Sequence, residues 1–142
     1  MTAVLRTLSF AALFLALQTG ASSLPIREIA RGDVSNIDRH TERLLRSSTE
    51  WTALWREHDF DHPAPPVDFS QEMVVAVFLG SQPTAGYAVR VTDVEGGAEE
   101  VGIRYRVTRP AAGDLTAQVL TFPYHIVAVP LRPGTPRFER VN

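Results

Sequence analysis

An unbroken apolar run at residues 73–79 constrains the fold of this chain more than any other feature. It contains only Met, Val, Ala, Phe and Leu side chains, and Gly80 ends it. An apolar run of this length that ends at a glycine is typical of a buried strand. We therefore expect the chain to build its core around this strand.

A loop with little backbone freedom follows the strand at residues 80–87, with the sequence Gly-Ser-Gln-Pro-Thr-Ala-Gly-Tyr. Pro83 fixes one backbone angle, and Gly86 can adopt a positive φ that a side chain would penalise. The chain is expected to leave the core, form this stiff loop and return on a second strand at Tyr87. Such a loop favours binding over chemistry. The predicted binding residues are Gln82, Pro83, Thr84, Gly86 and Tyr87.

The polar side chains of this loop suggest how it would bind. Gln82 and Thr84 would supply hydrogen bonds, and Tyr87 would supply a rigid amphipathic anchor. Tyr87 also fits as the first inward residue of the next strand, so both roles stay open. We expect loops near residues 109–114 and 130–136 to complete the contact surface.

Two segments after the loop alternate between apolar and polar residues and predict a hairpin. They span residues 87–92 and 101–107, and the Glu-Gly-Gly-Ala segment at 95–98 is a turn between them. The alternation points three arginines outward, namely Arg90, Arg104 and Arg106. Because exposed charged faces are common, we expect a solvated face with acids nearby rather than a docking site.

The last third of the chain predicts two further β segments. The first spans residues 116–129 and places Leu120, Phe122, Tyr124 and Ile126 on one side. Pro123 cannot donate to a strand ladder, so this strand should be kinked there or lie at an edge. Phe138 and Val141 predict a short final strand.

A short helix is predicted before the β-rich part of the chain. Ser47 and Glu50 have the spacing of a capping box, which predicts a helix from about Ser48 to His58. Trp51 and Trp55 fall on one face of it. Aromatic residues at this spacing are more often core anchors than a ligand platform, and we expect the former.

These elements predict a mainly β fold, a small antiparallel β-sandwich or half-open barrel with one N-terminal helix packed against it. The chain is divided into a signal peptide at residues 1–23 and a single domain at 24–142. That domain has an N-terminal strand and helix subregion at 24–66 and a β-rich body at 67–142. The proline-rich connector at 62–66 is too short to separate two domains.

The first residues have the pattern of an export signal. Arg6 precedes the apolar block LSFAALFLAL at residues 8–17, and small residues follow at 19–23. A membrane span needs roughly 20 apolar residues, so no membrane span is expected. The chain has no cysteine, which excludes disulfides, a thiol nucleophile and a lipid anchor on cysteine. We expect a periplasmic or secreted protein after cleavage.

Charge and motifs exclude several classes of function. The chain carries 14 basic and 16 acidic residues, which argues against binding to nucleic acid. No Gly-x-Ser-x-Gly element and no phosphate-binding glycine loop occurs, so we expect no catalytic residues and no enzyme. No cofactor is expected.

The segment His58-Asp59-Phe60-Asp61-His62 is the best candidate for a metal site. Zinc sites need a third and fourth ligand that the sequence does not offer here, so we expect no metal. His58 fits a helix C-terminus, where a positive charge is favourable, followed by a solvated loop. His125 is expected to form structural hydrogen bonds.

Three segments together resemble a known family. They are residues 67–80, the Pro-Thr-Ala-Gly-Tyr loop at 83–87, and Leu-Thr-Phe-Pro-Tyr-His-Ile-Val at 120–127. They are similar to the PrcB C-terminal domain, named for a subunit of a bacterial cell-surface protease complex. Residues 32–36 and 50–55 resemble the segment that often precedes this domain, so the resemblance covers roughly residues 26–129. The resemblance implies an exported, non-enzymatic domain that associates with or stabilises a protein partner such as a protease. Ala85 departs from it, because the family usually has a second glycine there.

The loop also supports an alternative function. Residues 82–87 are similar to the Asn-Pro-Thr-Thr-Gly-Tyr loop of chagasin-type inhibitors of cysteine peptidases, which present three loops from a β-sandwich. Arg109 and Pro110 match part of a second inhibitor loop, but Ala111 replaces its aromatic residue. The glycine-rich inhibitor loop has no clear counterpart in this sequence. The alternative is therefore a chagasin-like inhibitor.

Overall fold

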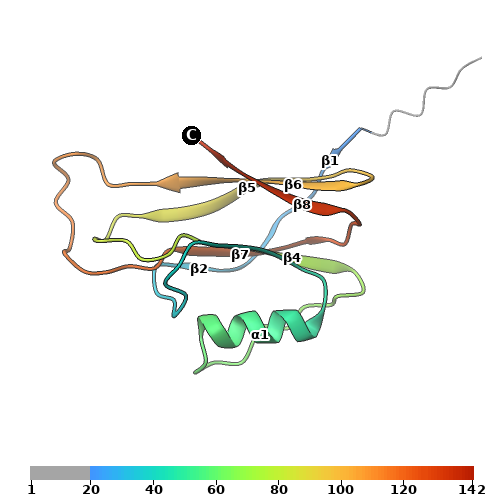
Figure 1. Cartoon of the computed structure of the whole chain (residues 1–142), viewed down its shortest axis with the longest axis horizontal. Coiled ribbons are helices and arrows are strands. Elements are labelled where there is room, and N and C mark those ends of the chain that lie inside the picture. Colours follow the sequence, from blue (N-terminus) through green and yellow to red (C-terminus); the bar gives the residue numbers. More distant parts are fainter. Residues whose placement is uncertain (1–19) are drawn as a thin grey trace, which may run out of the picture.

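A computed structural model describes residues 20–142, which form two four-stranded sheets and one helix (Figure 1). The elements are β1 (Ser22–Ser23), β2 (Arg27–Gly32), β3 (Thr41–Leu45), α1 (Ser48–His58), β4 (Glu72–Phe78), β5 (Ala88–Gly96), β6 (Glu100–Thr108), β7 (Tyr124–Pro130) and β8 (Thr135–Val141). The first sheet has the order β1-β5-β6-β8 and the second β2-β7-β4-β3; we call them the β5 sheet and the β4 sheet. The described strands form a sandwich and no closed barrel, which confirms the predicted fold class.

The predicted signal peptide lies largely outside the described residues. Only its last four residues are described, and two of these, Ser22 and Ser23, form β1, which pairs with Gly96 and Glu95 of β5. Strands β2 and β3, from the predicted subregion 24–66, form the two edges of the β4 sheet. Among the described residues, no helix is long and apolar enough to span a bilayer.

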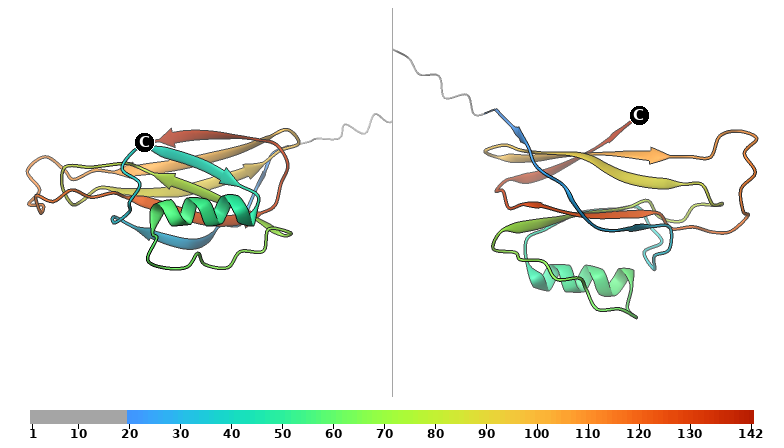
Figure 2. Two further views of the ribbon diagram at one scale, coloured as in Figure 1. Left: turned by 60° about the horizontal axis from the view of Figure 1, so that its bottom comes forward. Right: turned by 180° about the vertical axis from the view of Figure 1, so that it is seen from behind.

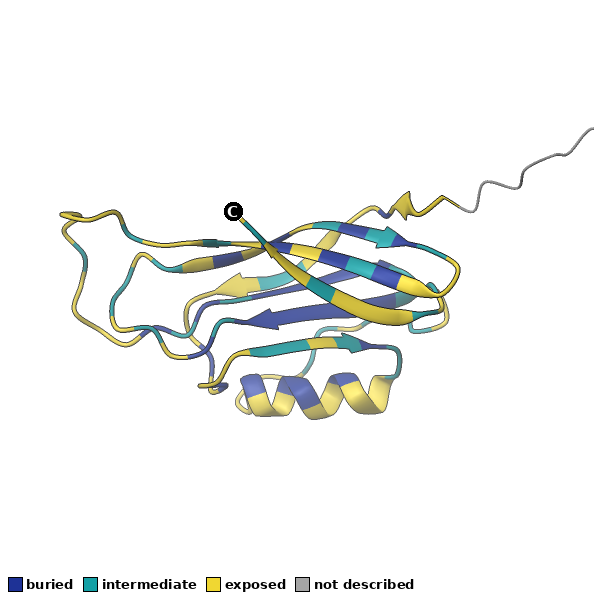
Figure 3. Ribbon diagram, turned by 45° about the horizontal axis from the view of Figure 1, so that its top comes forward, coloured by how far each residue is buried: buried dark blue, intermediate teal, exposed yellow. Residues whose placement is uncertain are grey.

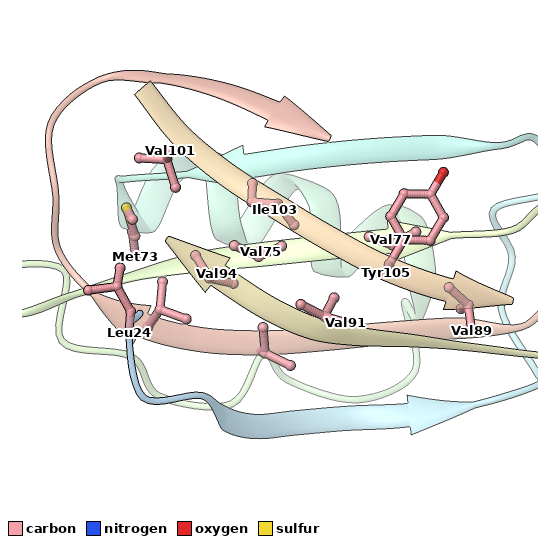
Figure 4. Close-up of a cluster of buried hydrophobic side chains, with 12 residues drawn as sticks. Leu24, Met73, Val75, Val77, Val89, Val91, Val94, Val101, Ile103 and Tyr105 are labelled. Carbon is pink, nitrogen blue, oxygen red and sulfur yellow. The ribbon is translucent and has the colours of Figure 1, made fainter. Parts of the chain in front are cut away.

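Strand β4 is the predicted buried strand, and both of its faces are covered. Met73, Val75 and Val77 face the β5 sheet and pack against its inward side chains (Figure 4). The alternate residues Val74, Ala76 and Phe78 pack under α1. Because neither face meets water, the strand is apolar at every position from 73 to 78, and Figure 3 shows it buried along this length.

The helix has the predicted bounds and lies across the outer face of the β4 sheet (Figure 2). Ser47 is its N-cap, since its Oγ accepts a hydrogen bond from the backbone N–H of Glu50. Trp51 and Trp55 are buried, and their indole N–H groups donate to the carbonyls of Pro65 and His62. The tryptophans are therefore core anchors, as predicted, and they also hold the proline-rich connector against the helix.

The predicted hairpin is formed by β5 and β6, which pair antiparallel with Val91 opposite Tyr105. A bulge between Val91 and Asp93 interrupts the ladder of β5. The predicted final strand is β8, but it runs parallel to β6. This parallel pair departs from the all-antiparallel expectation, because the chain crosses from β7 in one sheet to β8 in the other.

The predicted long strand at 116–129 is wrong in its first half. Only Tyr124–Pro130 is a strand, and Leu120 is exposed rather than turned toward the core. Pro123 precedes β7, and its carbonyl accepts a hydrogen bond from the N–H of Leu79. Because residues 116–120 pair with no described strand, their alternating side chains have no core to face.

Candidate binding surface

The loop at 80–87 leaves β4 through a glycine that no other residue could replace without strain. Gly80 has a φ of 82°. A Cβ atom there would lie 2.8 Å from the backbone N of His40 and 2.9 Å from the carbonyl C of Arg39. The next residue, Ser81, donates its N–H to the carbonyl of Asp38 at 2.9 Å. The start of the loop is thus fixed against residues 38–40.

The middle of the loop is fixed to a second loop. Gln82 and Thr121 exchange two backbone hydrogen bonds, at 2.8 and 3.0 Å. Ala85 donates its N–H to the carbonyl of Ala117 at 3.0 Å. The hydroxyl of Thr121 donates to the carbonyl of Thr84 at 2.8 Å. The two loops therefore form one unit, and the predicted stiffness of loop 80–87 has a backbone cause beyond Pro83.

Gly86 has the positive φ that the sequence predicts, at 92°. A Cβ atom at this position would lie 3.1 Å from Cβ of Pro110 and 3.4 Å from Cγ2 of Thr116. The end of loop 80–87 is therefore packed closely against Pro110 and Thr116 of the second loop, and a Cβ at Gly86 would require these side chains to shift.

The five predicted binding residues lie together on this loop with different degrees of exposure. Pro83 and Gly86 are exposed, whereas Gln82, Thr84 and Tyr87 are half-buried. The hydroxyl of Thr84 donates to the carbonyl of Ala85 at 2.9 Å, so its proton is used within the loop. Tyr87 lies outside both apolar clusters of the core and lines a surface hollow with Arg31 and Thr108.

The loop between β6 and β7 carries side chains that sequence reasoning missed. It projects beyond the sandwich (Figures 1 and 3). Leu115, Val119 and Leu120 are exposed on it. In the segment 110–121 the only charged residue is Asp114, and its carboxylate accepts the backbone N–H of Ala111 at 2.7 Å. The polar, glycine-containing stretch before Leu120 could have indicated a loop, but its apolar residues were assigned to a strand.

One predicted member of the contact surface lies elsewhere. Residues 130–136 are at the opposite end of the sandwich, where Thr135 donates its N–H to the carbonyl of Glu99 beside the β5–β6 turn. Tyr87 precedes the other end of β5. The segment 33–40 instead lies at the end that carries loop 80–87, because the backbone carbonyl of Asp33 accepts the N–H of Phe122 and that of Asp38 accepts the N–H of Ser81. Three connections therefore meet at one end: 33–40, 80–87 and 109–123.

The two histidines of the metal candidate lie in different environments. His58 is buried, its Nδ1 lies 2.8 Å from Oγ of Ser35, and its ring packs edge-on against Tyr124. Burial lowers the pKa of His58. His62 is exposed instead, and its Nδ1 lies 2.8 Å from Oδ2 of Asp59. Within residues 20–142 no group of three or more ligating side chains could hold a metal ion.

Of the three outward arginines of the hairpin, Arg104 has the acidic neighbours that were predicted, whereas no ion pair of Arg90 or Arg106 is found among the described residues. Arg104 contacts the carboxylates of Asp93 at 3.0 Å, Glu95 at 3.2 Å and Glu139 at 3.6 Å. Arg106 lies opposite Arg90 in the ladder and donates to the carbonyl of Asn142. Most of this face is therefore an ordinary charged surface.

Comparison with known proteins supports a family assignment for the central part of the chain. No curated protein and no solved structure matches the chain. The matched segment runs from β4 to the end of β7 and contains loop 80–87 as well as the projecting loop. Residues 73–130 match the protein family described as PrcB C-terminal, and over these residues the match confirms the resemblance predicted from the sequence.

Proposed function

We propose that this chain is an exported, non-enzymatic protein-binding domain of the PrcB-like kind, which associates with or stabilises an extracytoplasmic partner such as a protease. The binding surface is the end of the sandwich formed by loops 80–87 and 109–123, which we call the loop end. Residues 1–23 would direct export and be cleaved off in the process, which would place the mature protein in the periplasm or outside the cell.

One observation carries this proposal: the loop end is both fixed and nearly uncharged. Backbone hydrogen bonds join its two loops, and three large apolar side chains project from it, those of Leu115, Val119 and Leu120. Among residues 80–87 and 109–123, only Arg109 and Asp114 are charged. Protein interfaces are depleted of charge in their centre, and a contiguous exposed apolar patch marks an interaction site. A fixed surface also loses little conformational entropy on binding.

Affinity capture with surface variants tests the proposal. The purified domain is used to capture proteins from an envelope extract, which are then identified by mass spectrometry. We expect Leu115→Ser with Leu120→Ser to abolish recovery of the partner, and Thr84→Ala with Tyr87→Ala to reduce it. Phe60→Ser is the matched control, since Phe60 is an exposed apolar residue beside α1. Equal capture by wild type and all loop-end variants would exclude this surface.

The alternative function, inhibition of cysteine peptidases, gains support from the three connections that meet at the loop end. Chagasin-type inhibitors present three loops in this manner. The test is the residual activity of a papain-type peptidase mixed with a micromolar excess of the domain. Full residual activity excludes the inhibitor, and activity lost with wild type but retained with Thr84→Ala and Tyr87→Ala supports it.

A further inference from the structure

His125 is a buried histidine that connects the two sheets. It lies on β7 of the β4 sheet with 3% of its surface exposed. Its Nδ1 accepts a hydrogen bond from the backbone N–H of Val91, on β5 of the other sheet, at 2.8 Å. Its Nε2 lies 2.9 Å from Oε1 of Glu28 on β2. The ring therefore joins three strands from both sheets.

These partners fix the protonation state of the ring. A backbone N–H can only donate, so Nδ1 must be the unprotonated acceptor. The neutral ring then carries its proton on Nε2 and donates it to Glu28. A second proton could enter only at Nδ1, where it would face the N–H of Val91 and break that hydrogen bond. Protonation of His125 and its bond to β5 are therefore mutually exclusive.

Irregular strand pairing places both partners of His125. The ladder of β5 shifts between Val91 and Asp93, and the ladder of β2 shifts between Glu28 and Ala30. Bulges leave a residue out of the ladder and redirect its neighbours. In β5 the residue left out is Thr92, while Val91 keeps Tyr105 of β6 as its register partner; no described strand pairs with Val91 on its other side, so its N–H is available to His125.

On the side of β5 that faces away from β6, the segment that His125 contacts has few other hydrogen bonds. β1 pairs with β5 only at Glu95 and Gly96, and Leu24 adds one hydrogen bond to the carbonyl of Val94. No described strand pairs with residues 88–92 on the side away from β6. Loss of the bond between Val91 and His125 would therefore leave this edge held by apolar packing alone.

Charged groups from two strands surround the ring. Glu28 and Arg31 face it from β2 and Arg90 from β5, while Val77, its register partner on β4, brings no charge. Burial lowers the pKa of His125, Glu28 opposes this effect, and the two arginines reinforce it. A surface hollow lined by these residues reaches the ring and gives protons a path to it.

We propose that His125 is a proton-operated clasp between the two sheets: the neutral ring holds β5 to β7, and a proton on Nδ1 releases residues 88–92. β5 begins directly after Tyr87, so acid would loosen the end of loop 80–87. The clasp is a property of the fold, and it does not depend on whether the loop end binds a partner.

The test is an NMR titration of the wild-type protein combined with amide hydrogen exchange. At pH 7.5 the ring should show an unprotonated Nδ1 and a protonated Nε2. As the pH falls through the ring titration, the protection of the Val91 amide should fall roughly fivefold or more, the value of one lost hydrogen bond. The Val127 amide in the centre of the β4 sheet is the reference. Unchanged protection at Val91 through the titration, or a proton on Nδ1 at pH 7.5, would overturn the proposal.

Protonation of the buried His58 also makes the protein sensitive to acid. Two variants therefore separate the effect of protonating His125 from this general sensitivity. His125→Gln offers an acceptor to Val91 and a donor to Glu28 but does not titrate, so Val91 protection should be independent of pH. His62→Gln, at an exposed histidine, should behave like wild type. If His125→Gln does not fold, Glu28→Gln serves instead: it should move the ring titration to lower pH, and the release of Val91 must move with it. If the ring of His125 titrates at lower pH but the Val91 amide still loses its protection at the wild-type pH, the proposal is also overturned.

Discussion

At the scale of single residues, glycines at the loop end show how a backbone conformation can be enforced from outside the residue. Gly80 and Gly113 both have positive φ, 82° and 90°. A Cβ at Gly80 would meet the backbone of residues 39 and 40, whereas a Cβ at Gly113 would meet nothing within 4 Å. The first glycine is therefore required for space as well as for φ, and the second for φ alone.

This difference gives a matched pair of variants. Gly113→Ala should cost about 1 kcal/mol of unfolding free energy, the penalty of a positive φ for a side chain. Gly80→Ala should cost about 3 kcal/mol, because the strained backbone must also move away from His40. Urea denaturation of both variants measures the difference. Equal costs would show that the contact of Gly80 with residues 38–40 is not rigid.

The residue scale also shows the limit of sequence reasoning about the site. The positive φ of Gly86 was predictable, since a glycine after a proline-containing turn commonly adopts it. The bond from Thr121 to Thr84 and the pairing of Gln82 were not, because they join residues almost forty positions apart. The exposed leucines of the projecting loop were missed for the same reason: their exposure depends on the absence of a partner strand.

At the scale of elements, the local signals were the most informative. The cap at Ser47 and the spacing of the tryptophans predicted α1 with its observed bounds. The hairpin β5–β6 was also predictable, since its turn and its alternation lie within one short segment. The parallel pairing of β8 with β6 depends on how the chain crosses between sheets, which no local pattern encodes.

The helix gives the prediction that belongs to this scale. Trp51→Ala should destabilise the protein by about 3–5 kcal/mol, because it removes a buried aromatic side chain of α1 and its hydrogen bond to the carbonyl of Pro65. Thr52→Ala, at the next and exposed position, should change stability by less than about 0.5 kcal/mol. Thermal or urea unfolding measures both. A small effect of Trp51→Ala would mean that α1 is not part of the cooperative core.

At the scale of the whole molecule, the two ends of the sandwich carry different connections. One end carries the β5–β6 turn and the 130–136 connection, where Arg46 donates to the carbonyls of Arg132 and Gly134. The other carries three connections, and two of them form the fixed, nearly uncharged surface of the loop end. The sandwich thus provides a rigid base on which the loops are presented, which is how binding loops are commonly positioned.

Site-specific photo-crosslinking in the native cell tests the central claim, that the loop end binds a protein partner, most directly. A photoreactive residue is introduced at Leu115 and, as the control, at Phe60, which is exposed beside α1. The account predicts a covalent adduct with one extracytoplasmic protein from position 115 and none from position 60. Adducts from position 60 with none from position 115 would contradict it.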